Sequence, residues 1–363
     1  MVIDTKLLQE RCKKILNALS NKNGIFSDVL ELKAEGSNLL LNITDGSYYV
    51  SVKLPLEKEE SLHAIVNASL FLNLITKITT NTVTLKTTEK SLSIIGNGNY
   101  KLPNNSEVKE LTPITIDNVT SEFKIKNSIL QSIVKYNCKI LYSSDCRFPY
   151  VFIDDKGAVT YFNNACFNTF TLEQPISILL SDRLVKLFRL FKSDDINFTM
   201  GFDARADGAL QQKVSFSDDS LVLTAILSVG TDVSSKFPVE SLRKVADQVA
   251  PYSASIDKNQ WLDAIERLSL FRDKKNTFEQ AIHMTFTVDG ISMSDYSQQN
   301  FETVNFVNPC DNLMDTEFKA KYNASDLTLI LDACEDQYLT IAFGGKGLSI
   351  SKENIKNILP ECR

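Results

Sequence analysis

The sequence holds little of the material from which most catalytic and metal sites are built. It has two histidines, His63 and His283, and one tryptophan in 363 residues. Histidine is the commonest general base and a frequent zinc ligand, so a histidine-based centre has almost nothing to draw on. The motifs G-x-G-x-x-G, G-x-x-x-x-G-K-[ST], H-E-x-x-H and G-x-S-x-G are absent too. We therefore expect no metal, no cofactor and no enzymatic activity.

Cysteine pairs and long apolar runs are also missing. The seven cysteines are scattered, none forms a C-x-x-C pair, and their number is odd. A disulfide framework would be unusual in so large a chain, so reduced thiols are expected. No apolar run approaches the roughly 18 residues of a membrane span, and the N-terminal residues do not resemble a signal peptide. These absences predict a cytoplasmic protein.

Three stretches of the chain read as copies of one another. Each has an extended segment, a short polar cap, a leucine-rich helix, a polar turn and then two strands, and the copies begin at residues 63, 176 and 318. This spacing is far longer than the ~20–50 residues of a solenoid repeat, so whole domains are repeated. The expected domains are residues 1–119, 120–250 and 251–363. Each would carry two helices and about eight short antiparallel strands, which is an α+β fold.

One glycine-rich segment resembles a phosphate-binding loop at first sight. It is the stretch from Phe343 to Gly347, with the sequence FGGKG. A phosphate loop joins a strand to a helix, whereas this segment lies between two expected strands, so a hairpin turn is favoured. Acidic pairs such as Asp194-Asp195 and Asp218-Asp219 fall at expected turns and are interpreted as solvated turns.

Charge is unevenly distributed along the chain. The formal net charge is −6, from 39 basic and 45 acidic residues, which argues against a protein that coats nucleic acid. Five of the six expected helices are nevertheless rich in base, whereas the sixth is acidic. An amphipathic helix needs a polar face anyway, so each helix alone could be a solvated surface. If the helices lie side by side, their basic residues would form one surface. Such a surface would bind the phosphates of a nucleic acid without recognising its bases. The basic helix residues include Lys6, Arg11, Lys13, Lys14, Lys77, Lys135, Lys139, Arg183, Lys186, Arg189, Lys258 and Arg267.

Local matches in a fixed order connect the chain to a known family. The expected helix Arg183 to Leu190 is followed by an acidic turn, two strands and Lys236-Phe237-Pro238. The segment Asp145 to Phe148 has the sequence DCRF. The chain ends in Leu359 to Arg363, with the sequence LPECR. In this order the chain resembles the bacterial DNA polymerase III beta subunit, the sliding clamp, over essentially its whole length.

The resemblance implies three DNA-clamp domains per chain and a ring-shaped, head-to-tail homodimer whose helices line the hole. It implies a non-enzymatic processivity factor in DNA replication. This factor would encircle double-stranded DNA without sequence preference and bind DNA polymerase and clamp-loader subunits through short peptide motifs. Two alternatives stay open: a clamp-fold ring that serves a phage, plasmid or repair partner, and an α+β enzyme with an unrecognised site. Candidate dimer contacts are Leu270 and Phe271 against the far edge of the first domain.

The resemblance also assigns candidate site residues. Lys22, Lys77 and Arg147 match basic DNA contacts of the family, and the helix charges add Lys135, Lys139, Arg183 and Lys186. A peptide pocket between the second and third domains would use twelve positions. In this region the family pattern T-D-G-H-R-L is replaced by Asn163 to Asn168, NNACFN, so the partner motif is expected to differ. The pocket positions are Tyr150, Asn163, Ala165, Phe167, Pro238, Leu242, Phe278, Leu348, Leu359, Pro360, Cys362 and Arg363.

Overall fold

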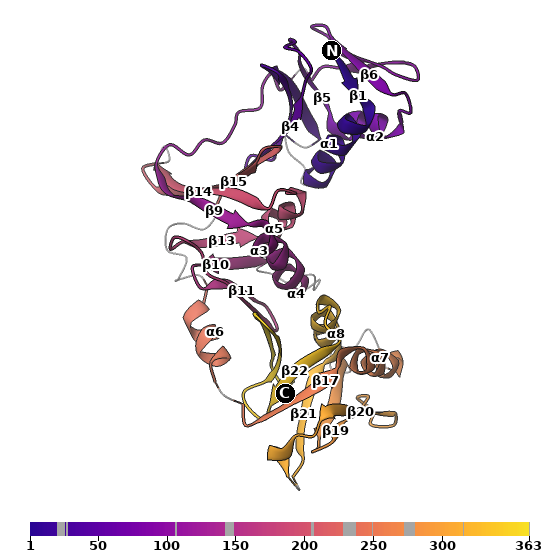
Figure 1. Ribbon diagram of the computed structural model, residues 1–363, viewed down its shortest axis with the longest axis vertical. Helices are drawn as coiled ribbons and strands as arrows, with labels where there is room; N and C mark the ends of the chain where they lie inside the picture. Colours follow the sequence, from indigo (N-terminus) through magenta and orange to yellow (C-terminus); the bar gives the residue numbers. More distant parts are fainter. Residues whose placement is uncertain are drawn as a thin grey trace. The chain divides into compact units, whose positions relative to one another are not determined.

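The computed structural model describes residues 1–19, 26, 28–105, 107–141, 149–204, 207–227, 237–248, 250–271, 280–314 and 316–362 (Figure 1). In these ranges the chain forms 24 strands. Contacts within the chain divide it into two compact units, Met1–Ser128 with Leu187–Thr231, and Ile129–Lys186 with Asp232–Arg363. Each unit is built on its own antiparallel sheets.

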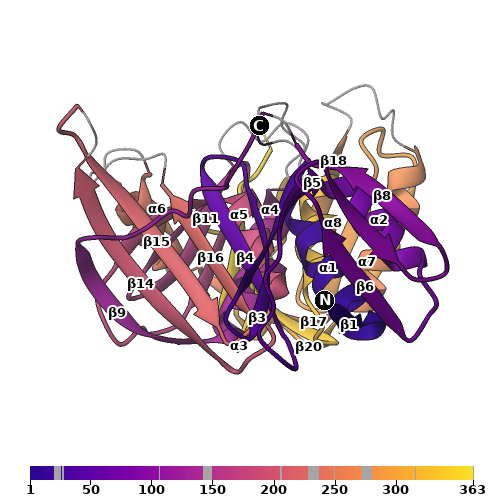
Figure 2. The same cartoon turned by 90° about the horizontal axis from the view of Figure 1, so that it is seen from above.

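The first unit contains two sheets. Its N-terminal strand lies at the edge of the four-stranded sheet, and β9, β14 and β15 run side by side in the eight-stranded sheet (Figure 2). The four-stranded sheet has the order β1 (Val2–Asp4), β6 (Thr82–Thr87), β7 (Ser91–Ile95), β8 (Asn99–Pro103). The eight-stranded sheet has the order β5 (His63–Asn67), β2 (Val29–Glu35), β3 (Asn38–Thr44), β4 (Tyr48–Pro55), β16 (Leu221–Ile226), β15 (Leu210–Asp218), β14 (Asp195–Ala204), β9 (Val119–Lys126).

The second unit contains one sheet of twelve strands. The pairing of β12 with β24 joins strands that are far apart in the sequence, with Ala165 opposite Ile358. The order is β13 (Ser177–Ser181), β10 (Tyr150–Asp154), β11 (Gly157–Tyr161), β12 (Ala165–Thr169), β24 (Ile355–Leu359), β23 (Leu348–Lys352), β22 (Tyr338–Phe343), β17 (Tyr252–Asp257), β20 (Phe301–Asn308), β19 (Gly290–Ser294), β18 (Ala281–Phe286), β21 (Phe318–Asn323).

Polar caps at the ends of strands start the longer helices. The Asp4, Asn67, Asp257 and Asn323 side chains each accept a hydrogen bond from a backbone N–H of the helix that follows. These bonds satisfy donors that a helix start leaves without partners. In the first and third repeats, this strand–cap–helix joint therefore precedes both helices. The sequence had indicated it only before the second helix of each repeat. The helices are α1 (Thr5–Ala18), α2 (Ala68–Lys77), α3 (Asn127–Ser132), α4 (Cys138–Ile140), α5 (Asp182–Leu187), α6 (Val239–Ala246), α7 (Lys258–Leu268) and α8 (Ala324–Ala333).

The expected helices are confirmed with different boundaries, and α6 is an addition that we did not expect. The third helix is interrupted by a π-helical turn, Ile133–Asn137. Asn137 is fully buried there and donates to the carbonyls of Ala158 and Cys166, so it is held by the sheet rather than by solvent. Between β15 and β16 the chain turns at Asp218, whose carboxylate accepts a hydrogen bond from the Ser220 backbone N–H. The hairpin reading of the glycine-rich segment is confirmed, since it connects β22 and β23.

The domain boundaries expected near residues 119 and 250 fall at the start of β9 and just before β17. The compact units do not follow these boundaries, because β4 pairs with β16 across the first and β12 pairs with β24 across the second. The division into three domains stays a prediction. Among the described residues, none of the helices has the length and apolar character to cross a membrane.

A connecting segment in the first unit is fixed by one carboxylate. Asp203 accepts hydrogen bonds from the backbone N–H groups of Asp117 and Asn118, and its carboxylate lies 2.8 Å from the Lys213 amine. The Lys213 contact, with those backbone donors, holds the pKa of Asp203 at about 2 although burial opposes the shift. The ionised form is therefore favoured in the folded state.

Replacing this carboxylate should destabilise the protein in a pH-dependent way. We expect Asp203→Asn to lower the free energy of unfolding by about 2 kcal/mol at neutral pH, because charged hydrogen bonds are lost. The depressed pKa means that the wild-type advantage is complete above pH ~4 and disappears as the pH falls towards 2. Urea unfolding of both proteins from pH 7 down to pH 3 checks this. Asp219→Asn, at an exposed turn, is the control, and an Asp203→Asn deficit that does not shrink at low pH would contradict the prediction.

Candidate functional site

The structure places the predicted DNA-binding residues in different environments. Lys77 is exposed in the last turn of α2, and no ion pair to it occurs among the described residues. Arg183 and Lys186 are half-buried on α5, where the Lys186 amine lies 2.6 Å from the Asp182 carboxylate. Lys22 and Arg147 lie outside the described residues.

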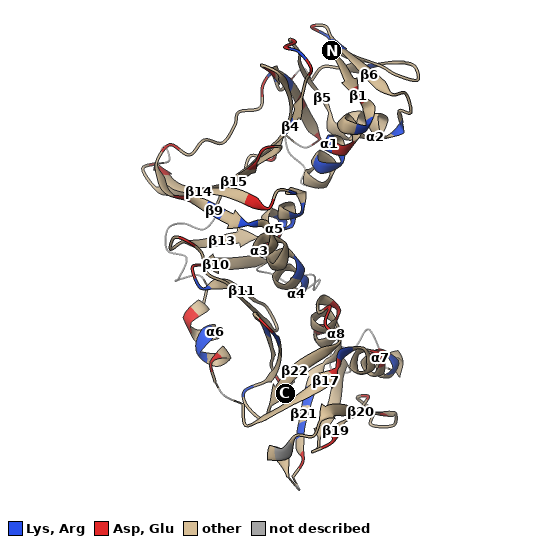
Figure 3. Cartoon of the chain, in the orientation of Figure 1, with Lys and Arg blue, Asp and Glu red and all other residues tan. Residues whose placement is uncertain are grey.

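Within the second unit, α4 lies beside α8 (Figure 3), and Lys135 and Lys139 form ion pairs with acidic residues in and just after α8. The Lys135 amine lies 2.7 Å from the Glu335 carboxylate, and the Lys139 amine lies 3.8 Å from that of Asp332. Burial is the largest single influence and lowers the pKa of Lys135, but the contacts with Glu335 and Tyr136 together outweigh it and raise the pKa overall. These two charges are therefore partly neutralised by Asp332 in α8 and Glu335 just after it, and they are less available to a phosphate than Lys77.

One basic residue of the first helix points into the protein. Lys14 is 7% exposed, and its amine donates to the Ser220 hydroxyl over 3.0 Å. Burial, followed by the nearby Arg11 charge, lowers the pKa of Lys14. Lys6 and Lys13 on the same helix are exposed. The basic surface of α1 is therefore smaller than a count of its lysines indicates.

Helix α6 covers the opposite face of the twelve-stranded sheet from α4 and α8 (Figure 1). The Arg243 guanidinium binds both oxygens of Asp154 at 2.6 and 2.7 Å, and the rings of Phe152 and Phe237 stack 5.6 Å apart. A bidentate pair of this kind fixes orientation as well as distance. The side chains of β10 that contact α6 thus define one face of the sheet, which we call the α6 face.

Strand register continues the α6 face across the β12–β24 junction. Phe152 pairs with Val159, Val159 with Phe167, and Phe167 with Lys356. Directly paired residues project from the same face of a sheet. Ala165 and Ile358 form the next pair of this face, beside the junction.

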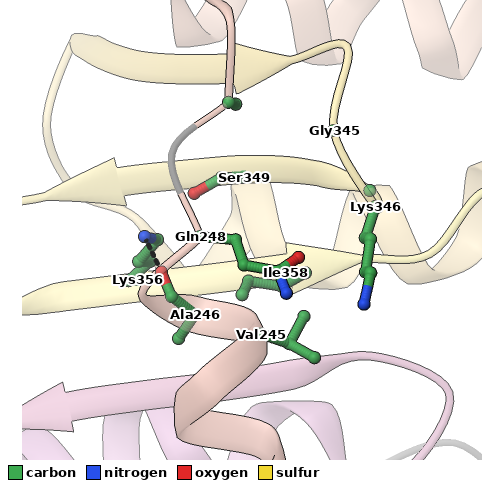
Figure 4. A pocket seen from close by; sticks show the side chains of 10 residues that line it. Val245, Ala246, Gln248, Gly345, Lys346, Ser349, Lys356 and Ile358 are labelled. Atoms are coloured by element: carbon green, nitrogen blue, oxygen red, sulfur yellow. Dashed lines mark hydrogen bonds between the residues drawn. The ribbon is translucent and has the colours of Figure 1, made fainter.

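A cavity of about 150 Å³ lies at the C-terminal end of α6 (Figure 4). Its walls come from the end of α6, the turn between β22 and β23, and the two C-terminal strands. The Lys356 amine donates to the carbonyl of Ala246, which joins β24 to the last turn of α6. The residues that line the cavity are Val245, Ala246, Gln248, Ala250, Gly345, Lys346, Gly347, Ser349, Lys356 and Ile358.

Some of the predicted pocket residues share the α6 face with this cavity. Ala165 and Phe167 lie on that face, and Pro238 and Leu242 belong to the first turn of α6 and its approach. In contrast, Leu348 and Leu359 pair with each other, are 0% and 1% exposed, and belong to the apolar core of the second unit. They offer no surface to a ligand in this structure.

The other described pocket residues lie in different environments. Tyr150 is half-buried at the start of β10, and Pro360 is exposed. The Cys362 backbone N–H donates to the Lys321 carbonyl over 2.8 Å, and exposed Asn163 hydrogen-bonds the buried Asp326 carboxyl. Burial raises the pKa of Asp326, and the Asn163 bond opposes it. Phe278 and Arg363 lie outside the described residues.

Sequence reasoning missed Val245, Lys346, Lys356 and Ile358 as cavity residues. The signal for Ile358 was the alternation along β24, where Ile355, Asn357 and Leu359 are buried and Lys356 and Ile358 are half-buried. That alternation shows that β24 has two faces, but it does not show which face a helix covers. Because helix α6 was not predicted, the cavity could not be assigned to either face of β24.

The shape of the cavity depends on a glycine in its wall. A Cβ added to Gly347 would lie 2.6 Å from the Leu359 carbonyl oxygen, which belongs to the backbone and cannot move aside cheaply. We expect Gly347→Ala to disturb the β23–β24 pairing and to lower the free energy of unfolding by about 1–3 kcal/mol. The matched control is Gly345→Ala in the same turn, where the nearest atom would be 3.7 Å away. Thermal unfolding checks the difference, and equal melting temperatures for the two variants would contradict the packing argument.

Comparisons with known proteins agree with this architecture. No curated protein shows a significant sequence match to the chain. The family of the DNA polymerase III beta subunit N-terminal domain matches residues 1–126. Among solved structures, the chain is similar to the DNA polymerase beta subunit of Streptococcus pyogenes, with a TM-score of 0.80 and 15% identity, over 100% of this chain and 99% of that one.

Two further structures show the same full-length similarity. The DNA polymerase sliding clamp of Pseudomonas aeruginosa gives a TM-score of 0.82 at 14% identity, over 100% of this chain and 99% of that one. The DNA polymerase III beta subunit of Thermotoga maritima gives 0.78 at 13% identity, over 100% and 98%. The chain therefore has the sliding-clamp fold over its whole length, and its residues 1–126 match the family of the DNA polymerase III beta subunit N-terminal domain.

Proposed function

We propose that this protein is a DNA sliding clamp, a processivity factor that encircles duplex DNA and tethers a replicative polymerase. The observation that carries the proposal is the full-length similarity to sliding clamps, which covers 100% of this chain and 99% of the Pseudomonas clamp. A local match would support one domain only. A match that includes every domain supports the assembly in which those domains act together.

The distribution of charge suits such a protein. A ring that holds DNA topologically needs no base contacts, and its lining should attract phosphates weakly enough to slide. Exposed lysines on the first two helices, Lys6, Lys13 and Lys77, would supply that attraction. The acidic total charge of −6 would keep the exterior of the ring from binding DNA.

Ring closure would use a second copy of the chain. Leu270 and Phe271 follow α7 and are 79% and 60% exposed. Adjacent large apolar side chains that are this exposed mark interaction surfaces in soluble proteins. In the proposed head-to-tail homodimer they would pack against the first domain of the partner chain.

The partner-peptide site would lie on the α6 face. Half-buried Leu242 and Ile358 would supply an apolar surface there, buried Ala165 and Phe167 would support it, and the cavity beside Ile358 would add depth. Short peptides bind such sites through one or two buried apolar side chains and a few polar contacts. DNA polymerase and clamp-loader subunits are the partners proposed for this site. Leu348 and Leu359 would support it from the core rather than touch the peptide.

Retention on circular DNA tests the topological mechanism. Protein assembled on a circular duplex and freed of excess by gel filtration should stay bound through moderate salt, because leaving requires the ring to open. It should be lost quickly once a restriction enzyme linearises the circle. Equal loss rates from circular and linear DNA, or a stable monomer near 40.7 kDa in sedimentation, would contradict the ring.

The individual lysines should contribute unequally to DNA binding. Lys77→Gln should reduce the slope of log affinity against log salt by about 0.9, the value for one phosphate contact on B-DNA. Lys135→Gln should reduce it less, because Glu335 already neutralises part of that charge. Fluorescence anisotropy with a short duplex measures the slopes. Lys101→Gln, on strand β8, is the control. If it reduces the salt slope as much as Lys77→Gln does, the assignment of DNA binding to the helix lysines is wrong.

A further inference from the structure

One end of the twelve-stranded sheet has a face covered by a helix and a face that is exposed. It consists of β20, β19, β18 and β21, which are neighbours in that order. Glu302 of β20 pairs with Arg267 of α7 at 2.7 Å, so α7 covers one face. The alternate positions project from the other face, which we call the lysine face, and none of them is acidic. They are His283, Thr285, Ser292, Ser294, Phe301, Thr303, Lys319 and Lys321.

An aromatic ring and a cation stand at opposite ends of the lysine face. Direct strand pairs connect them in one row across the sheet, in the order Phe301, Ser294, His283, Lys321. Three strand spacings of ~4.8 Å separate the two ends, about 14 Å in all. Phe301 is 67% exposed. Lys321 is exposed on β21 (Figure 3), and no ion pair to it occurs among the described residues.

A second cavity, of about 270 Å³, lies over the lysine face. Phe301 and Lys321 line it, and between them the lining holds the hydroxyl groups of Thr285, Ser292 and Ser294. Its volume is close to the ~300 Å³ at which small-molecule pockets begin. Hydroxyl groups can donate to phosphate oxygens and to the edges of bases. The cavity thus combines an apolar ring, neutral hydrogen-bond donors and a cation.

The charge of the lysine face favours an anion. Burial, followed by the nearby Lys321 charge, lowers the pKa of His283, so at neutral pH the lysines are the cations. The Lys319 amine lies 3.1 Å from the Glu317 carboxylate, but both side chains are exposed, and such pairs contribute little. Of the described residues that line the cavity, only Glu361 is acidic. Two ammonium groups against one carboxylate leave a net attraction for phosphate.

The turn between β19 and β20 holds another aromatic ring beside this face. Buried Asp295 accepts hydrogen bonds from the Ser297 hydroxyl, the Asn300 side chain and two backbone N–H groups of the turn. Burial is the largest single influence and opposes ionisation, but these bonds together hold the pKa of Asp295 at about 2. Tyr296 in this turn is 47% exposed and lies edge-on to the His283 ring, 6.4 Å between centroids. The aromatic end is therefore fixed before a ligand binds.

We propose that the lysine face binds single-stranded DNA. A base stacks on Phe301, and a phosphate of the same strand binds Lys319 and Lys321. Stacking on aromatic side chains beside a basic groove is how proteins hold single strands without sequence preference. A duplex has no free base faces inside its stack, so it cannot use the aromatic end. In the proposed clamp the helices face the duplex, and this opposite face would hold a strand that has left it.

Anisotropy with a fluorescein-labelled oligothymidine of about 12 nucleotides tests the proposal, since single-strand sites span ~4–16 nucleotides. Phe301→Ala and Phe301→Leu should each weaken binding about tenfold, whereas Phe301→Tyr, which keeps the ring, should bind like wild type. Lys319→Gln with Lys321→Gln should reduce the slope of log affinity against log salt by about 1.4, at ~0.7 for each phosphate contact on a single strand. None of these variants should change the affinity for the same oligonucleotide annealed to its complement.

The controls separate the lysine face from exposed rings and charges in general. Tyr338→Ala removes a ring that is 48% exposed but does not line the cavity, and Lys244→Gln removes an exposed lysine of α6; both should bind like wild type. Sedimentation and thermal unfolding check that the Phe301 variants keep the wild-type assembly and fold.

Three results would overturn the proposal. They are no binding of the single strand by wild-type protein, equal affinities for wild type and Phe301→Leu, and displacement of the labelled strand by an oligoglutamate peptide at lower concentration than by unlabelled strand. The last result would assign the face to an acidic protein partner. Retention on circular duplex is measured separately, so the clamp proposal stands or falls independently of all three.

Discussion

The pairing of β12 with β24 is the interaction on which the architecture of the second unit depends. It joins two strands separated by almost two hundred positions of sequence into one sheet, with Ala165 opposite Ile358. The junction brings the π turn and α4 against α8 on one face, where Lys135 reaches Glu335. On the other face it places β24 below the end of α6, where Lys356 binds the Ala246 carbonyl. One register therefore positions both the helix contacts and the cavity.

Electrostatics follows from this packing rather than from the number of charges. Lysines that look equivalent in sequence have three different environments: Lys77 is exposed, Lys135 is paired with Glu335, and Lys14 points into the protein. In the proposed clamp, the surface that faces DNA should attract phosphates only weakly, and the Glu335 carboxylate would reduce that attraction at Lys135. The cavity shows the reverse effect, since its walls collect two ammonium groups from an acidic chain.

Much of the fold was predictable because it is encoded locally. Asn67 and Asn323 are good N-caps in any context, and the Gly344 turn, with φ of +84°, needs glycine wherever it stands. Helix α6 was not predictable in the same way: it has eight residues and is held by Arg243 on a distant Asp154. Leu359 was expected at the surface of the pocket and lies in the core, because one step along a strand exchanges the two faces.

The sequence by itself determined the repeated strand–cap–helix joints, the hairpins and the basic character of five helices, since caps, turns and charges act over a few residues. It also determined the order of elements that makes the chain resemble a sliding clamp. Only the tertiary structure decided which lysines remain available, which face of β24 meets α6, and where a cavity forms. Those outcomes depend on long-range strand pairing and side-chain burial, in which residues far apart in the chain set each other's environment.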